Sequence, residues 1–261
     1  MARSADSAIN IDELQSRARR FLPGLLYDYL AGGVEDECGL AANRSAFERW
    51  RFLPKYMIDT TARSGLTKLF EQEFSVPFGI APTGFAGLLN PGADLMLARA
   101  AESEGVPYIM SGVSNASLEM AAETAPTATW YQLYLARDEH ISLDMAKRAG
   151  DAGIRNLVVT IDLPVNSKRE RDMRNGFKLP PRLSPAIILA GLTHPRWTFR
   201  FLTNGGMPNF ENWVPYVQGP VTALNVAQFV RTQSPPAQSW QHLAKLREAW
   251  NGNSDQGHPA S

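Results

Sequence analysis

Residues 129–162, TWYQLYLARDEHISLDMAKRAGDAGIRNLVVTID, contain the pattern that decides the fold. The aromatic run TWYQLY at 129–134 is followed by a helix-forming stretch at 138–153, and then by the apolar run NLVVTID at 156–162. Short β-branched or aromatic runs that flank an amphipathic helix are typical of a β-α-β unit. Because the two strands of such a unit lie parallel, we expect a parallel sheet.

The same pattern extends toward the N-terminus. Similar runs predict strands at Val76–Pro82 and Val106–Ser111, and the helix-forming stretches GADLMLARAAESEG (92–105) and ASLEMAAET (116–124) follow them. Residues 10–50 carry cap signals and apolar spacing for three short helices. The sequence therefore predicts an α/β fold in which about four β/α units follow short N-terminal helices.

The pattern changes after the fourth predicted strand. Residues 182–236 are rich in Pro, Gly, Trp and Phe, and we expect a long irregular insertion there. Helical spacing returns at 239–250, but NGNSDQGHPAS at 251–261 lacks the apolar content of a buried strand. We expect this last segment to be a tail and the parallel sheet to stop at four strands.

Composition limits the class of protein. Lys plus Arg equals Asp plus Glu at 26 each, so no net charge favours a nucleic acid as partner. Cys38 is the single cysteine, which excludes an internal disulfide and fits the cytoplasm. The N-terminus lacks the apolar core of a secretory signal, and the apolar run AIILAGL (186–192) is too short to span a bilayer. We expect one soluble domain over residues 1–261.

Five segments, in order and spacing, carry a resemblance to a known family. They are FLPGLLYDYLAGGVEDE (21–37), FGIAPTGF (78–85), YIMSGVSNAS (108–117), WYQLY (130–134) and VVTIDLPVNSKRERDMRNGFKLPP (158–181). Together they resemble the FMN-dependent L-2-hydroxy-acid dehydrogenases, which include mandelate and lactate dehydrogenases and glycolate oxidases. The resemblance implies the N-terminal part of a (β/α)8 TIM barrel, here incomplete, with FMN as cofactor and the site at the carboxyl ends of the strands.

The resemblance assigns cofactor roles to six residues at those strand ends. Pro82, Thr83 and Gly84 resemble residues that pass the flavin edge with backbone groups, and Ser111, Gln132 and Thr160 resemble side chains that hydrogen-bond the isoalloxazine ring. Without the family motifs, Pro82, Thr83 and Gly84 would be interpreted as an ordinary strand-to-loop turn, and the other three as solvated polar residues at strand ends.

Substrate roles fall on three further residues. Tyr29 and Arg169 resemble groups that hold the carboxylate of a 2-hydroxy acid, and Tyr134 resembles a phenol beside the reacting hydroxyl. A guanidinium suits a carboxylate because its N–H donors form a planar fork. Val113 stands where plant-type relatives carry a bulky aromatic residue, which favours a mandelate-like substrate over a smaller acid. The alternative interpretations are that each tyrosine is an ordinary packed aromatic residue, and that Arg169 lies in a solvated charged loop.

The resemblance places the proton chemistry outside this sequence. The family's general-base histidine, its partner arginine and a lysine at the fifth strand are expected beyond residue 261, and the four histidines here lack the His-Gly-Gly context and any metal-ligand spacing (His140, His194, His242 and His258). We therefore expect this chain alone to bind FMN poorly and to turn over no substrate. A frameshift is one hypothesis, because Asp255–Pro259 in a shifted frame can encode a motif like the family's strand-five lysine motif.

Three questions about partners stay open. The electron acceptor is a quinone, a cytochrome or oxygen. A second interpretation, from another class, is a non-catalytic half-barrel that associates with itself or with a complementary chain, because open sheet edges favour association. Residues 184–204 mix apolar residues with Arg196 and Arg200, as an interfacial anchor does, and predict peripheral contact with the inner face of the cell membrane. The alternative is a lid or packed surface loop.

Overall fold

The computed structural model describes residues 7–162, 167–177, 185–233, 238–250 and the backbone of 253–255. Contacts divide the chain into two compact units, each formed by two stretches of sequence. The first unit comprises Met1–Ile58 and Ser167–Gly206, and the second comprises Asp59–Asn166 and Met207–Ser261. Each unit is described by itself.

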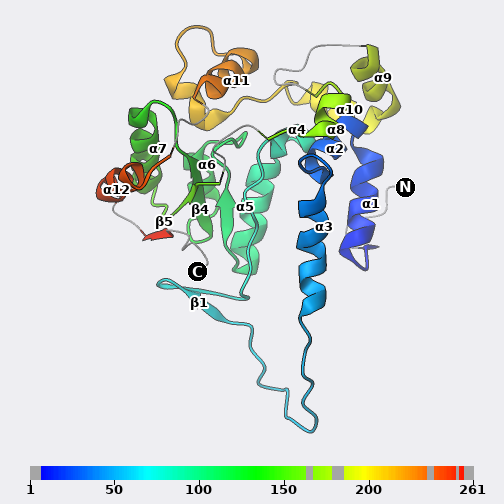
Figure 1. Cartoon of the computed structure of the whole chain (residues 1–261), viewed down its shortest axis with the longest axis vertical. Coiled ribbons are helices and arrows are strands. Elements are labelled where there is room, and N and C mark those ends of the chain that lie inside the picture. The colour runs from blue at the N-terminus through cyan, green and yellow to red at the C-terminus, as the bar shows by residue number, and fades with distance from the viewer. Residues whose placement is uncertain (1–6, 163–166, 178–184, 234–237, 251–252, 256–261) are drawn as a thin grey trace. The chain divides into compact units, whose positions relative to one another are not determined.

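A four-stranded parallel sheet forms the centre of the second unit (Figure 1). Its strands follow one another in the order β3 (Tyr108–Met110), β4 (Thr129–Tyr134), β5 (Asn156–Thr160) and β6 (Asn253–Asp255). The register pairs Ile109 with Trp130 and Tyr134 with Thr160. The predicted α/β fold with a parallel sheet is confirmed, and the sheet does not close into a barrel within the described residues.

The prediction of an extended strand at Val76–Pro82 is wrong. Only Ile80 pairs with the sheet, through an isolated parallel bridge to Tyr108. The Ile80 amide donates to the Pro107 carbonyl at 2.8 Å, and the Ile109 amide donates to the Ile80 carbonyl at 3.0 Å. Pro77 and Pro82 lack an N–H to donate, which explains why apolar character here does not produce a longer ladder.

The expectation that no strand follows residue 250 is also wrong. Strand β6 pairs with β5 in parallel, with Asn156 opposite Asn253 and Val158 opposite Asp255. Strand pairing uses backbone groups that every non-proline residue carries, so polar residues such as Asn253, Ser254 and Asp255 can add to a sheet edge. Residues 251, 252 and 256–261 of the predicted tail lie outside the described residues.

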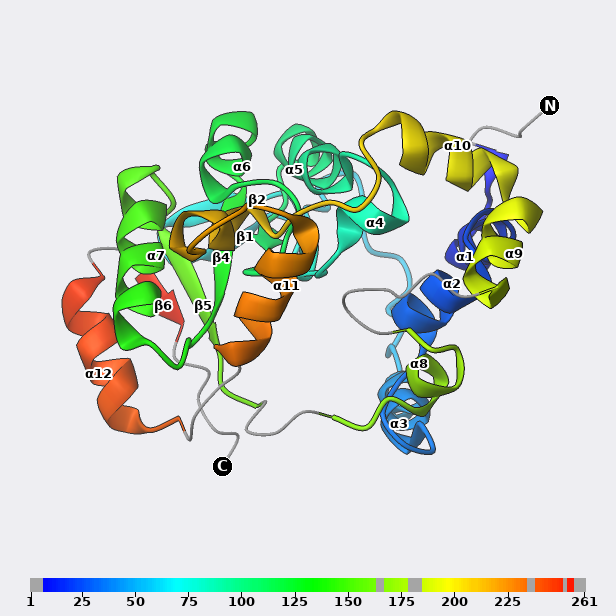
Figure 2. The ribbon, with the colours of Figure 1, turned by 90° about the horizontal axis from the view of Figure 1, so that it is seen from above.

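Helices cover one face of this sheet, and their contacts form the core. Figure 2 shows three of them side by side: α5 (Ala93–Glu104), α6 (Leu118–Thr124) and α7 (Glu139–Asp151). Helix α12 (Trp240–Ala249) packs on α7. Fully buried side chains between the sheet and these helices include Met110, Tyr131, Leu133, Met145 and Leu157. Burying such apolar surface is the main stabilising contribution to the unit.

The opposite face of the sheet is covered at its amino end by a hairpin that the sequence pattern does not indicate. Strands β1 (Thr67–Leu69) and β2 (Gln72–Phe74) pair antiparallel. Phe70 and Phe74 approach Trp130 of β4, with ring centroids 5.8 and 6.1 Å apart. Asn156 of β5 donates to the Gln72 side chain at 3.1 Å. The hairpin therefore covers this face at the amino ends of the strands. The polar residues predicted for the site lie on the same face, at the carboxyl ends of the strands.

The predicted irregular insertion at 182–236 is largely helical where it is described. Helices α9 (Pro185–Thr193) and α10 (Pro195–Thr203) belong to the first unit, whereas the 3-10 helix η3 (Glu211–Tyr216) and α11 (Ala223–Thr232) belong to the second. Pro195 begins α10 and the Thr222 hydroxyl caps α11, so each start follows ordinary helix chemistry. Residues 182–184 and 234–236 lie outside the described residues.

The first unit is otherwise helical, and its three predicted N-terminal helices are confirmed. These are α1 (Ile11–Phe21), capped by Asn10, α2 (Gly24–Ala31) and α3 (Cys38–Ser45), which continues into the 3-10 helix η2 (Ala46–Arg49). Helix α8 (Glu170–Arg174) packs against α2. Across the described residues, each helix is too short or too polar to span a bilayer.

Candidate functional site

The carboxyl ends of β3, β4 and β5 bring three predicted residues together. Ser111 follows β3 directly, Gln132 lies within β4 and Thr160 ends β5. Parallel register places residues 111, 132 and 158 level with one another across the sheet, and Thr160 beside Tyr134. Their side chains share the face opposite the helices, because alternate residues of a strand point to opposite faces. The structure therefore brings these three residues together, while their predicted roles stay a prediction.

Hydrogen bonds join these three side chains into one cluster, which we call the polar triad (Ser111, Gln132 and Thr160). The Ser111 hydroxyl lies 3.4 Å from Gln132 Oε1 and donates to it, and Gln132 Nε2 donates to Thr160 Oγ1 at 2.8 Å. The Gly112 amide also donates to Gln132 Oε1, at 3.1 Å. This last bond fixes the orientation of the Gln132 amide, since a flipped group would place two donors against each other.

The polar triad has hydrogens left over after these bonds. A glutamine amide carries two N–H groups and a threonine hydroxyl carries one, so Gln132 retains one N–H and Thr160 its O–H, neither of which has a partner within the described residues. Gln132 and Ser111 are 2 and 3 % exposed, so these groups are fixed by their surroundings. The triad therefore offers fixed donors to a ligand that carries acceptors along one edge, as an isoalloxazine ring does.

Pro82, Thr83 and Gly84 lie in the loop that follows the Ile80 bridge. The next residue, Phe85, has a φ of 60°, and its amide donates to the Val113 carbonyl at 3.3 Å. This bond ties the end of the Pro82–Gly84 loop to the residues that follow Ser111. The loop belongs to the same strand ends as the triad, and Thr83 and Gly84 are half-buried.

Tyr134 ends β4, opposite Thr160. Burial raises the pKa of its phenol above the usual value, and the nearby Asp162 carboxylate adds to the effect. The phenol therefore stays protonated at neutral pH and can donate a hydrogen bond. Val113, the residue predicted to limit substrate size, is half-buried in the loop after β3.

Tyr29 and Arg169 are together in the first unit. The Arg169 guanidinium lies over the Tyr29 ring, 5.2 Å from its centroid. Its Nε donates to Asp172 Oδ2 at 2.7 Å, and its Nη2 donates to the backbone carbonyls of Tyr29 and Gly32. One side of the guanidinium fork is therefore occupied within the protein. Nη1 keeps its two N–H groups without a partner among the described residues, so Nη1 is the nitrogen that can meet a carboxylate.

Arg171, two residues after Arg169, is paired with acidic residues of the same unit. It donates to Glu37 and lies 3.7 Å from Asp28. The Gly33 amide and the Arg171 guanidinium hold the pKa of the Glu37 carboxyl below its usual range. Helix α8 is thus fastened to the residues around α2 by ion pairs.

Sequence reasoning missed a group of residues that support the triad from a distance. Asn209, Asn212 and Trp213 bond to residues 112–118, which follow Ser111. A partner 94 to 101 residues away leaves no periodic signal in the sequence, so these contacts were not accessible to pattern analysis.

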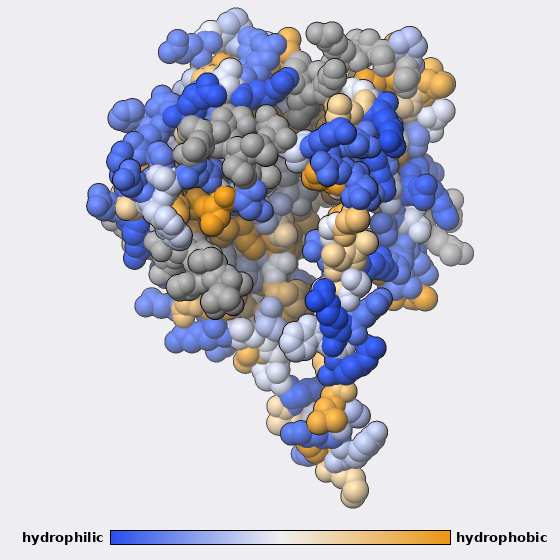
Figure 3. All heavy atoms as spheres, viewed as in Figure 1, coloured by the Kyte–Doolittle hydropathy of each residue, from blue (hydrophilic) through white to orange (hydrophobic). Residues whose placement is uncertain are grey.

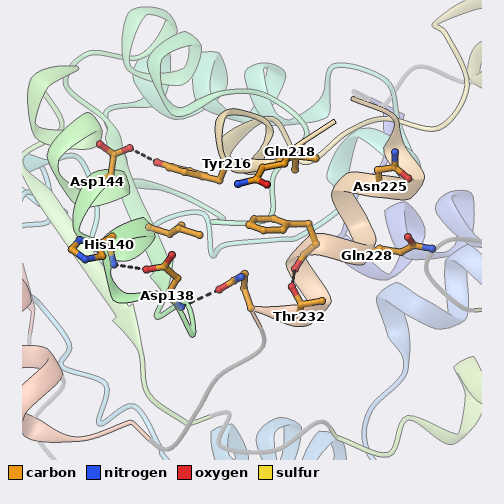
Figure 4. Close-up of a pocket in the computed structure, with 12 residues that line it drawn as sticks. Asp138, His140, Asp144, Tyr216, Gln218, Asn225, Gln228 and Thr232 are labelled. Carbon is orange, nitrogen blue, oxygen red and sulfur yellow. Dashed lines mark hydrogen bonds between the residues drawn. The ribbon is translucent and has the colours of Figure 1, made fainter. Parts of the chain in front are cut away.

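A separate cavity of about 690 Å³ lies between α7 and α11 (Figure 4). Tyr216 and Asp144 point toward each other there, with the phenol donating at 2.5 Å, and burial raises the pKa of Tyr216 to about 12. His140 also lines this cavity, whereas the predicted site residues do not. Among the described residues, groups of His, Cys, Asp and Glu with metal-binding geometry are absent.

Comparison with known proteins agrees with this geometry. The family model described as FMN-dependent dehydrogenase matches residues 18–254. The (S)-mandelate dehydrogenase of Pseudomonas putida is 37% identical over 247 residues, which are 94% of this chain and 62% of that protein. The 4-hydroxymandelate oxidase of Amycolatopsis orientalis is 40% identical over 190 residues, which are 73% of this chain and 53% of that protein.

Solved structures give the same result. A crystal structure of the monotopic membrane protein (S)-mandelate dehydrogenase superposes with a TM-score of 0.88 at 36% identity, covering 95% of this chain and 65% of that one. A crystal structure of mandelate oxidase gives a TM-score of 0.73 at 32% identity, covering 95% and 62%. The chain therefore spans about three fifths of the length of these relatives.

Proposed function

This chain belongs to the FMN-dependent dehydrogenase family, and from that premise we propose that it supplies the flavin-ring side of an enzyme that oxidises an L-2-hydroxy acid to the 2-oxo acid. The observation that carries the proposal is the polar triad, which joins residues at three adjacent strand ends and keeps two spare donors, one N–H of Gln132 and the O–H of Thr160. Bound FMN supplies the two-electron acceptor for such a reaction.

The residues of this chain would hold the cofactor rather than move the substrate's proton. Gln132 and Thr160 direct hydrogens at acceptors on the ring, which favours negative charge on that ring because fixed donors need no reorganisation. Backbone groups of Pro82, Thr83 and Gly84 would pass the ring edge. The proton acceptor is assigned to none of the described histidines. The imidazole of His242 serves in the cap of α12, that of His194 approaches a carbonyl, and His140 lines the separate cavity between α7 and α11.

Substrate binding is assigned to Tyr29, Tyr134 and Arg169. The free Nη1 of Arg169 would bind one carboxylate oxygen, and the protonated phenol of Tyr134 would donate to the substrate oxygen. The compact Val113 side chain, together with the similarity to a mandelate dehydrogenase and a 4-hydroxymandelate oxidase, favours an aryl 2-hydroxy acid over lactate.

A titration of FMN into the purified 261-residue chain tests the proposal. We expect weak, saturable quenching of flavin fluorescence that Gln132→Leu weakens at least tenfold, because the variant removes the central donor of the triad. Gln228→Leu, an exposed change on α11, is the matched control. Absence of saturable binding at millimolar FMN contradicts the assignment. A purified chain that carries one FMN per molecule, and whose flavin absorbance is bleached by a 2-hydroxy acid, would contradict the expectation that this chain alone is inactive.

We further propose that helices α9 and α10 form a membrane-contact surface, within the predicted segment 184–204; Ser184 lies outside the described residues. Five of its apolar side chains are more than half exposed (Ile188, Leu189, Leu192, Phe199 and Leu202). Exposed Arg196 and Arg200 lie on α10. Clustered apolar side chains beside cations are typical of helices that lie in a bilayer interface, and one similar structure is described as a monotopic membrane protein.

Sedimentation with vesicles tests this surface. We expect the chain to bind vesicles that contain anionic lipid and to bind neutral vesicles less, since Arg196 and Arg200 add attraction to anionic headgroups. Leu192→Asp combined with Phe199→Asp should abolish binding, whereas Met120→Asp, a change at an exposed apolar residue of α6, should not. Equal binding by both variants contradicts the proposal.

Association with a second chain is a second candidate function, favoured by the residues between α3 and β1. Six apolar side chains in this stretch are at least 82 % exposed (Phe47, Trp50, Phe52, Leu53, Tyr56 and Met57). Figure 3 shows apolar atoms on the extended segment at the bottom of the view. Such exposure favours a partner surface. Size-exclusion chromatography with light scattering, with and without FMN, tests it: a strictly monomeric chain contradicts self-association.

A further inference from the structure

We propose that Asn212 and Trp213 are positioning residues, which hold the loop after β3 in the conformation that presents the polar triad to the flavin. We call residues 111–118 the site loop and residues 209–213 the brace segment. The inference deepens the proposed function and rests on it for the identity of the ligand.

Four hydrogen bonds connect the brace segment to the site loop. Trp213 Nε1 donates to the Gly112 carbonyl at 2.9 Å, and Asn115 Nδ2 donates to the Asn209 carbonyl at 2.8 Å. Asn212 makes the other two: its Oδ1 accepts from the Leu118 amide at 2.8 Å, and its Nδ2 donates to the Ser114 hydroxyl at 3.2 Å. Both ends and the middle of the loop are therefore held.

These bonds are shielded from water, which makes each one costly to lose. Asn212 and Ser114 have no exposed surface, and Trp213 is 3 % exposed. A buried donor or acceptor without a partner destabilises a protein by more than the bond itself contributes, because its desolvation is then uncompensated. The site loop thus has a strong preference for the conformation that satisfies the brace segment.

The brace segment is itself fixed by neighbours outside the site loop. The Arg148 guanidinium of α7 donates to the Asn212 carbonyl at 3.1 Å and to Glu119 at 2.8 Å. Phe210 packs edge-on against Phe85, with ring centroids 4.3 Å apart. Because the brace segment is anchored in this way, it can hold the site loop in one conformation instead of moving together with it.

Gly112 links the brace segment to the polar triad. Its carbonyl accepts from Trp213, and its amide donates to Gln132 Oε1 at 3.1 Å. A Cβ at this position would lie 2.8 Å from the Gln132 carbonyl, so the loop lies directly against β4. A continuous path of hydrogen bonds therefore runs from the Trp213 indole through Gly112 and Gln132 to Thr160.

The opposite side of the site loop is held separately. Asp94 Oδ2 accepts from the Asn115 amide at 3.1 Å, and Asn115 Oδ1 accepts from the Gly87 amide at 3.0 Å. These contacts would remain if the brace segment were released. Loss of Trp213 should therefore loosen the loop near Gly112 without unfolding the unit, which distinguishes positioning from general stabilisation.

Hydrogen exchange of backbone amides in the flavin-free chain is the direct test. We expect Trp213→Phe to speed exchange of the Gly112 and Val113 amides about tenfold, the effect of one buried hydrogen bond, because these amides bond to Gln132 and Ser111. The Leu118 amide, held by Asn212, should change less. Asn212→Leu should give the reverse pattern, with Leu118 affected most.

Trp250→Phe is the matched control, because this equally buried tryptophan packs near Gly150 of α7. It should leave exchange at Gly112 and Val113 unchanged. Uniformly faster exchange in Trp213→Phe, or equal local exchange in Trp213→Phe and Trp250→Phe, overturns the inference. Where Asn212→Leu fails to fold, the comparison of the two tryptophan variants still decides.

Titration with FMN separates this inference from the proposed function. We expect the dissociation constant of FMN to rise about tenfold in Trp213→Phe and to stay the same in Trp250→Phe. Faster exchange at Gly112 and Val113 in a chain that binds no FMN would contradict the proposed function. The inference would then apply only to the geometry of the polar triad. Unchanged affinity and unchanged exchange in Trp213→Phe would overturn the inference while leaving the flavin assignment intact.

Discussion

The two units hold their predicted site residues in different ways. In the second unit, Gln132 and Thr160 lie on paired strands, and their side chains bond to one another while keeping hydrogens for a ligand. In the first unit, Arg169 precedes the five-residue helix α8, and one side of its guanidinium is occupied by Asp172 and two carbonyls. The comparison teaches that strand pairing preorganises a site through the backbone, whereas a short helix does so through ion pairs that water can reach.

Gln132→Leu should produce the largest effect on stability. It leaves the Ser111 hydroxyl, the Gly112 amide and Thr160 without their partner, so the free energy of unfolding should fall by about 4 kcal/mol. Urea denaturation followed by circular dichroism measures the change. Gln228→Leu on the exposed face of α11 is the control. A loss below about 1 kcal/mol would mean that the triad is not preorganised.

Asp94→Asn should act in the opposite direction and depend on pH. Burial raises the pKa of Asp94 from 3.8 to about 6, so the folded protein binds more protons than the unfolded chain between these values. Stability contributed by this group is therefore present below about pH 4 and falls as the pH rises to about 6, by up to about 3 kcal/mol.

The variant lacks this ionisation, so it should be as stable as the parent chain at pH 4 and about 3 kcal/mol more stable than the parent chain at pH 8. Urea denaturation of both chains across this range gives the difference. Equal stability at both ends of the range would show that the carboxyl is solvated, and would weaken the account of how the site loop is held.

Arg169→Lys should have a smaller effect, because the side chain is 32 % exposed. A lysine keeps the charge but cannot reach Asp172 and the two carbonyls with one planar group, so we expect a loss of about 1 kcal/mol, reduced further in 1 M salt. Arg174→Lys, at 78 % exposure, is the control. A loss as large as that of Gln132→Leu would remove the contrast between the units.

Surface ion pairs should contribute least in both units. Lys147 and Asp151 in the second unit, and Arg174 and Glu170 in the first, are pairs four residues apart on helices with a cation that is at least 70 % exposed. Lys147→Ala and Arg174→Ala should leave the urea midpoint unchanged within error. A measurable shift of the urea midpoint in only one of these variants would mean that the two units differ in their surface ion pairs, rather than in how they hold their site residues.

Sequence patterns predict the parts of the fold that local chemistry determines. The strand ends that carry Ser111, Gln132 and Thr160 were predictable because short β-branched and aromatic runs alternate with helical stretches, and this β-α-β pattern fixes which residues reach the carboxyl edge. Pro195 at the first position of α10 and the Thr222 cap of α11 were visible signals that the Pro- and Gly-rich composition obscured. Those two helices were therefore predictable in principle.

Other features depend on tertiary contacts that leave no such signal. Strand β6 forms through backbone pairing in a polar segment, and the Val76–Pro82 run loses its ladder to proline. The bonds from Trp213 to Gly112, and from Arg169 to the carbonyls of Tyr29 and Gly32, join residues far apart in the sequence. Composition and periodicity could therefore not reveal that one guanidinium edge is already occupied.

The locked amide of Gln132 has a consequence for ligand selectivity. Its oxygen accepts from Ser111 and Gly112, so the side chain can present to an incoming molecule only a hydrogen, never a lone pair. A heterocycle whose matching edge carries an N–H in place of a carbonyl would meet donor against donor and be rejected. In the proposed flavin site, Gln132 would therefore distinguish tautomers and isosteres that have the same outline, which shape alone would admit.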